Sequence, residues 1–147
     1  MKIDFKDNNY IIYLNKYNIM NMDFNNTKVL EKNLKSLLLR LKKCYKIDIH
    51  GYYNITIYID NYYGAILKIE EDKEYYDCFD DTVALRLKKI KTNFLYEIDD
   101  ISYVYNFIDK VKINTNKDKI YIKILKCLEN KEYLNLLEVS NIIYESG

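Results

Sequence analysis

The chain has 147 residues, of which 49% are apolar and 31% are charged, and its formal net charge is +1. This composition is typical of one folded globular domain and excludes a disordered chain. The small net charge argues against a dedicated nucleic-acid binder, whose affinity comes mainly from many uncompensated Lys and Arg side chains.

Turn residues and helical spacing predict the first elements of the chain. Apolar-rich runs at 2–5 and 10–14 flank a polar Lys-Asp-Asn-Asn turn and predict a β-hairpin. Asn26 or Thr27 can cap a helix over 27–44, because either side-chain oxygen accepts a hydrogen bond from a free N–H of the first turn. One face of this helix carries leucines at helical spacing, namely Leu30, Leu34, Leu37, Leu38 and Leu41.

Residues 46–60 alternate between apolar odd positions and polar even positions, which is typical of a strand with one buried face. The same alternation, with apolar residues at odd positions, continues after a turn at 61–64 and predicts a second strand at 65–71. We expect the leucine face of helix 27–44 to cover the odd face of these two strands. Gly51 favours a bend in the first strand. The even face would stay open and carry His50, Tyr52, Asn54, Thr56 and Tyr58.

The second half of the chain contains further alternating segments. Strands are predicted at 83–88 and 94–98, with residues 91–93 turning between them. Another strand is predicted at 120–124, introduced by a turn at 116–118.

Helical spacing is also present in the second half. An amphipathic helix is predicted from 101 to 112, and its apolar face carries Ile101, Val104, Ile108 and Val111. A short helix is expected around 133–138. The spacing of apolar residues over 139–145 is compatible with either a helix or a strand.

These elements predict an α+β fold. We expect a mostly antiparallel sheet with one long amphipathic helix and one or two shorter helices packed on one face. The chain has no Pro and three Gly, so the usual linker signal is missing. Residues 1–147 are therefore predicted to form a single compact domain, and an acidic stretch near 72–82 is the expected boundary if the chain is subdivided.

The sequence lacks the usual catalytic and cofactor motifs. His50 is the only histidine, so it would have to serve any nucleophilic Ser or Cys as the base. No Gly-rich phosphate loop is present, and Cys44, Cys78 and Cys127 lack the spacing of a zinc site or a disulfide framework. We therefore expect no catalytic residue, no metal and no cofactor, and reduced cysteines that are at least half buried.

Two parts of the chain are candidates for binding. One is the even strand face with His50, Tyr52 and Tyr58. The other is an acidic stretch that a basic partner could recognise. Its carboxylates are Glu70, Glu71, Asp72, Glu74, Asp77, Asp80 and Asp81.

Single-stranded nucleic acid is an alternative ligand for the even face. Tyr52 and Tyr58 could stack bases, and Arg86 and Lys88 could contact phosphates. The 17 Tyr residues do not by themselves favour this, because many Tyr, Ile, Asn and Lys with no Pro or Trp are typical of an AT-rich genome.

The sequence also bears on location and assembly. The N-terminal segment is charged throughout, and no stretch approaches the roughly 20 apolar residues of a membrane-spanning helix. We expect a cytoplasmic protein without a membrane partner. Unpaired strand edges favour a homodimer.

Several short segments are similar to a known family. Met1-Lys2-Ile3, Ile11 to Leu14, Asp23-Phe24 and Lys46 to Gly51 resemble the N-terminal domain of MecA-type adaptor proteins, which hand substrates to a Clp ATPase. Phe94 to Asp100, followed by a helix, is similar to the start of that family's Clp-binding half. The resemblance implies an adaptor-like class, and it assigns no binding residue in this chain.

The sequence thus favours a non-catalytic, cytosolic protein-interaction or adaptor module that binds a protein partner. Two alternatives stay open. One is a small enzyme that uses His50 or the carboxylates of residues 70–81, and the other is a single-stranded nucleic-acid binder that uses the even face.

Overall fold

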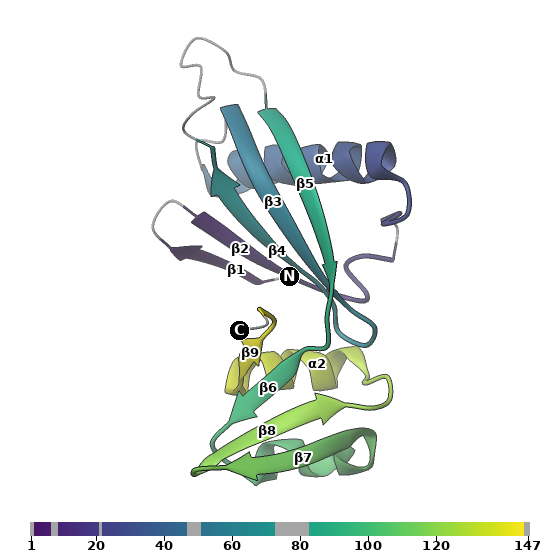
Figure 1. The fold of residues 1–147 in the computed structure, drawn as a ribbon, viewed down its shortest axis with the longest axis vertical. Coiled ribbons are helices and arrows are strands. Elements are labelled where there is room, and N and C mark those ends of the chain that lie inside the picture. Colours follow the sequence, from purple (N-terminus) through teal and green to yellow (C-terminus); the bar gives the residue numbers. More distant parts are fainter. Residues whose placement is uncertain (1, 7–8, 21, 47–50, 73–82, 146–147) are drawn as a thin grey trace.

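The computed structural model describes residues 2–6, 9–20, 22–46, 51–72 and 83–145. These residues form nine strands in two mostly antiparallel sheets, together with three helices, so the α+β prediction is confirmed. The first sheet and its helix come from the N-terminal half of the chain, and the second sheet with two helices comes from the C-terminal half (Figure 1).

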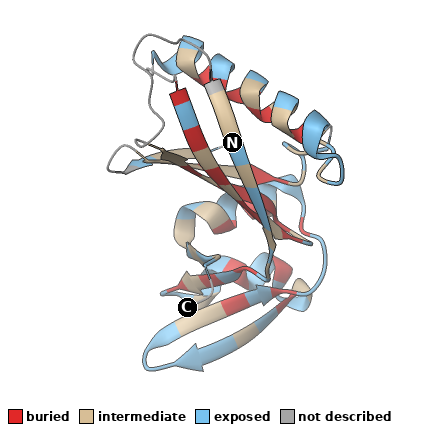
Figure 2. Ribbon diagram, turned by 45° about the horizontal axis from the view of Figure 1, so that its top comes forward, coloured by how far each residue is buried: buried red, intermediate tan, exposed pale blue. Residues whose placement is uncertain are grey.

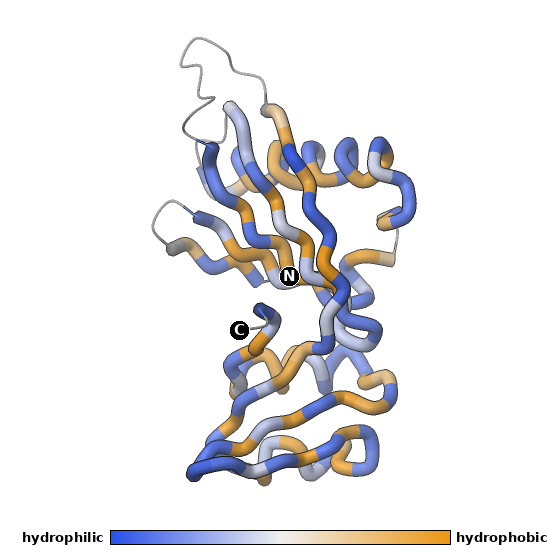
Figure 3. The backbone as a smooth tube through the Cα atoms, viewed as in Figure 1, coloured by the Kyte–Doolittle hydropathy of each residue, from blue (hydrophilic) through white to orange (hydrophobic). Residues whose placement is uncertain are grey.

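The first sheet has five strands. In spatial order they are β1 (Lys2–Lys6), β2 (Asn9–Asn15), β4 (Gly64–Glu71), β3 (Gly51–Asp60) and β5 (Val83–Lys91). Neighbours are antiparallel except β3 and β5, which are parallel. Figure 3 shows the alternation of hydrophobic and hydrophilic residues along these strands. The two predicted hairpins are therefore both present.

The strand expected from residue 46 begins later. Lys46 ends the preceding helix in a left-handed conformation with φ of 53°, so it is a helix cap and not a strand residue. Residues 47–50 lie outside the described residues. Gly51, which favours a bend, has φ of 92° at the first position of β3.

Helix α1 (Thr27–Tyr45) covers one face of the first sheet. Asn26 caps it, because its side-chain oxygen accepts a hydrogen bond from the Val29 N–H at 3.3 Å. The five leucines of the stripe are buried against odd-numbered residues of the sheet, such as Ile55 and Leu67, as predicted. Figure 2 shows the buried side of α1 turned toward the strands. Each buried leucine stabilises the fold by roughly 1.5–3 kcal/mol.

The second sheet has four strands, all antiparallel. In spatial order they are β7 (Val111–Asn116), β8 (Lys119–Ile124), β6 (Leu95–Ile98) and β9 (Asn141–Ile143). The helices η2 (Ile101–Lys110) and α2 (Asn130–Val139) pack on the same face of this sheet. The segment 139–145 therefore contains the end of α2 and a short edge strand.

The turn predicted at 91–93 does not join a hairpin. Strands β5 and β6 lie in different sheets, and residues 92–94 carry the chain from one sheet to the other. Alternation identifies a strand but says nothing about its partner, which explains the error. The prediction of one domain, with a boundary near 72–82 if subdivided, stays a prediction.

The helix predicted over 101–112 is shorter and tighter. Residues 101–110 form 3₁₀ turns with a kink at Phe107, whose φ of −136° and ψ of 32° are not helical, and Val104 and Phe107 are the buried residues. Ile108, expected on the buried face, is 47% exposed. Val111 already belongs to β7, so the pattern combines a short helical segment with the start of a strand.

Asp60 connects the two halves of the molecule near the segment 92–94, where the chain passes from the first sheet to the second. Its carboxylate is buried and accepts hydrogen bonds from the backbone N–H groups of Tyr62, Tyr63 and Phe94, at 2.9, 2.8 and 3.0 Å. The first two bonds close the turn between β3 and β4, and the third holds the segment that enters the second sheet. The side chain of one residue therefore links the first sheet to the segment that enters the second.

A second set of contacts ties α2 to the first sheet. The Tyr133 hydroxyl donates to the Tyr62 carbonyl oxygen and accepts from the Leu128 N–H. The Asn15 amide donates to Asn130 Oδ1 at 3.0 Å. The two halves are thus connected by partly buried hydrogen bonds as well as by the chain itself.

Candidate functional site

The even face of the first sheet brings several predicted residues together. Tyr52 and Asn54 of β3 lie beside β5, where Asn54 is in register with Arg86 and Thr56 with Lys88. Tyr52 is 43% exposed at this end of the sheet. Tyr52 and Arg86 also line a small hollow of about 200 Å³.

Tyr58 does not belong to an open surface, which corrects the prediction. It is 9% exposed and lies in the core of the C-terminal half, with its ring 4.9 Å from that of Tyr144. Its hydroxyl donates to Glu145 Oε1 at 3.2 Å. The C-terminal segment covers this end of the even face, and the sequence period could not show that. The nucleic-acid alternative therefore loses one of its two aromatic residues.

The acidic candidates are described only in part. Glu70, Glu71 and Asp72 are half-buried at the end of β4. The Asp72 N–H donates to the Tyr52 carbonyl oxygen at 2.8 Å, so the chain still follows the sheet at this point. Other predicted site residues, namely His50, Glu74, Asp77, Asp80 and Asp81, lie outside the described residues.

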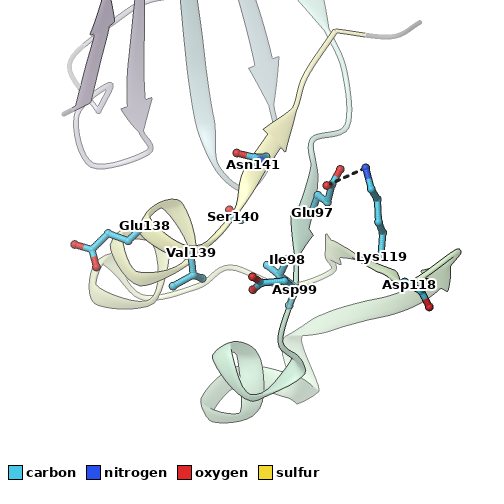
Figure 4. Close-up of a pocket in the computed structure, with 9 residues that line it drawn as sticks. All are labelled: Glu97, Ile98, Asp99, Asp118, Lys119, Glu138, Val139, Ser140 and Asn141. Atoms are coloured by element: carbon cyan, nitrogen blue, oxygen red, sulfur yellow. Dashed lines mark ion pairs between the residues drawn. The ribbon is translucent and has the colours of Figure 1, made fainter.

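A groove of about 380 Å³ lies in the C-terminal half (Figure 4). Glu97 forms an ion pair with Lys119 at 3.4 Å, and Glu138 points away from this pair (Figure 4). The carboxylates therefore do not converge on one point. Within the described ranges, no group of three or more His, Cys, Asp or Glu residues could hold a metal ion.

A cleft of about 280 Å³ lies between β2 and α2, with Leu134 and Leu137 on one wall. The polar wall is already engaged, because Asn15 Oδ1 accepts from the N–H groups of Tyr17 and Asn18 while its amide holds α2. This cleft is part of the joint between the two halves.

The outer face of the second sheet is a further open surface. The helices η2 and α2 both lie on the opposite face, and Figure 1 shows the outer face uncovered. Cross-strand neighbours Leu95 and Ile143 are 36% and 37% exposed there. A hollow of about 330 Å³ on this face is lined by Leu95, Lys112, Asn114, Asn116, Tyr121 and Lys123.

The outer face is basic at one end. Lys112 of β7 lies directly opposite Lys123 of β8, and both side chains are exposed. Lys119, nearer the turn, is neutralised by Glu97. The face thus combines an apolar pair, a half-buried Tyr121 and two lysines that form no ion pair with any other described residue.

Sequence reasoning did not identify this surface. Residues 111–112 were assigned to a helix, so β7 and its alternation went unrecognised. Val111 and Ile113 alternate with Lys112 and Asn114, and this signal could have predicted the strand. The pairing of β7 with β8 requires the tertiary structure.

The cysteine prediction is also corrected. Cys44 and Cys127 are free and exposed, where half-buried thiols had been expected, and Cys78 lies outside the described residues. Cys44 follows the last buried leucine of α1 by three positions, on a turn that faces solvent.

Comparisons with family models, with curated proteins and with solved structures find no match to this chain. A search of the described helices finds none with the length and apolar character needed to cross a membrane.

Proposed function

We propose that this chain is a non-catalytic interaction module that binds a protein partner through the outer face of its second sheet. The observation that supports the proposal is the uncovered sheet face with an apolar pair, Leu95 and Ile143, beside polar and charged residues of β7 and β8. Protein interfaces combine apolar side chains, which are buried away from water in the complex, with polar and charged side chains that stay solvated. The similarity to MecA-type adaptors is in keeping with this role.

Burial of the apolar pair by a partner would be favourable in free energy. Each side chain keeps about a third of its surface in water. Full burial of such a side chain contributes roughly 1.5–3 kcal/mol, so covering the remaining third would contribute roughly 0.5–1 kcal/mol for each residue. Tyr121 is half-buried in the hollow that Leu95 also lines, and it offers further aromatic surface to a partner.

The proposal is tested by changing the apolar pair of the face. Leu95→Glu with Ile143→Glu places charge where a partner would bury apolar surface, and Leu39→Glu on the outer side of α1, 54% exposed, is the matched control. The three full-length proteins, immobilised in equal amounts, are compared for the proteins that they retain from native lysate, identified by mass spectrometry.

We expect one set of proteins to be retained by the wild type and by the Leu39 variant and lost from the double variant. Circular dichroism checks that all three are folded. If the double variant is folded and retains the same proteins as the wild type, this face is not the binding surface.

A further inference from the structure

We infer that the outer face recognises an acidic, extended segment of the partner, with carboxylates bound between Lys112 and Lys123. This inference rests on the proposed function and names the chemistry of the partner. It begins from the register of β7 and β8, which places the two lysines directly opposite each other. Like charges at such a position are only about 4.5–5.5 Å apart at Cβ and destabilise the strand pair.

Neighbouring groups that the structure describes do not compensate the two charges. Among the described residues, neither Lys112 nor Lys123 forms an ion pair, whereas Lys119 on the same face is paired with Glu97. Lysine on an edge strand can protect a sheet from aggregation, and this would account for Lys112 on β7. It does not account for Lys123, because β8 is an interior strand. A bound anion would compensate both.

The surroundings of the lysine pair suit an extended peptide. The hollow of about 330 Å³ is lined by both lysines, by Leu95 and by the amides of Asn114 and Asn116. A carboxylate could accept hydrogen bonds from both ammonium groups, and an apolar side chain of the same segment could cover Leu95. The ligand that fits is therefore a segment in which acidic and apolar residues lie close together.

An acidic protein segment fits this surface better than single-stranded nucleic acid does. Nucleic-acid binding needs several phosphates neutralised and aromatic side chains free to stack. The face offers two uncompensated lysines, and its aromatic residue, Tyr121, is half-buried. The exposed apolar pair Leu95 and Ile143 would gain no favourable contact with a charged phosphate backbone.

The test uses defined probes and the full-length chain. Fluorescence anisotropy measures binding of a short labelled peptide that alternates glutamate with leucine, of its glutamine–leucine analogue, and of oligothymidylate. We expect the glutamate peptide to bind more tightly than the glutamine peptide. Its affinity should fall as the salt concentration rises.

Charge reversal identifies the residues. In the variant that combines Lys112→Glu and Lys123→Glu, two attractive contacts become repulsive, so the affinity for the glutamate peptide should fall roughly tenfold or more. Lys131→Glu, an exposed position on α2 on the other side of the sheet, is the control and should bind as the wild type does. Lys123→Glu alone should raise the denaturation midpoint, because it replaces repulsion of Lys112 with attraction.

Equal binding of the two peptides, or no binding of either, would overturn the inference of an acidic partner. Tighter binding of oligothymidylate, with loss in the double lysine variant, would overturn it in favour of nucleic acid. These results are independent of the lysate comparison with the Leu95 and Ile143 variant, so the proposed function can stand when this inference fails.

Discussion

Replacement of Asp60 by alanine should destabilise the protein more than any other single change of a polar side chain described above. The carboxylate accepts three backbone hydrogen bonds, and those from Tyr63 and Phe94 are fully buried. A buried N–H that loses its partner costs about 1–3 kcal/mol. The two buried donors alone therefore predict a loss of about 2–6 kcal/mol, out of the roughly 5–15 kcal/mol that stabilise a typical domain.

The conservative variant tests the same reasoning at a smaller magnitude. In Asp60→Asn, the amide oxygen can still accept from the N–H groups of Tyr62 and Tyr63, but the amide nitrogen then faces the Phe94 N–H, and two donors meet. We expect a loss of about 1–3 kcal/mol, so the order of stability should be wild type, Asn variant, Ala variant.

Urea denaturation followed by circular dichroism and by tyrosine fluorescence measures these free energies. Asp109→Ala, at an exposed position of η2, is the control and should change the free energy of unfolding by less than about 0.5 kcal/mol. If Asp60→Ala lowers it by less than about 1 kcal/mol, the carboxylate does not hold the crossing between the sheets, and this account of the fold is wrong.

Two further predictions concern tyrosines and pH. Tyr96→Phe should leave stability unchanged or raise it by up to about 1 kcal/mol, because the buried Tyr96 hydroxyl has no hydrogen-bond partner among the described residues. Tyr133→Phe should lower stability by about 1–3 kcal/mol, because it leaves the Leu128 N–H and the Tyr62 carbonyl oxygen unpaired. Thermal or urea denaturation of the two variants measures these changes, and equal effects of Tyr96→Phe and Tyr133→Phe would contradict the prediction. A hydrogen bond from Lys68 at 2.8 Å lowers the pKa of Glu145 below its ordinary value of 4.5. The charged carboxylate therefore contributes stability above pH 4.5 that is lost as the pH falls through the lowered pKa. The stability difference between the wild type and Glu145→Gln, roughly 0.2–1 kcal/mol at neutral pH for this half-exposed pair, should disappear in acid. A difference that persists at low pH would contradict the assignment.

The predicted site and the observed surfaces overlap only in part. Tyr52, Arg86 and Lys88 share one face because strand parity assigns each side chain to a side of its own strand. Tyr58 has the same parity and is nevertheless buried, because Tyr144 and Glu145 from the far end of the chain cover it. Parity predicts which side of a sheet a residue occupies, and it cannot predict what lies over that side.

The sequence by itself determined the α+β class, the two hairpins of the first sheet and the burial of the α1 leucines against its odd face. These features depend on side-chain period and turn chemistry, which act over a few neighbouring residues. The tertiary structure alone decided that 92–94 crosses between sheets and that Lys112 faces Lys123. Strand partners are chosen by the packing of segments far apart in the chain, and no local period records that choice.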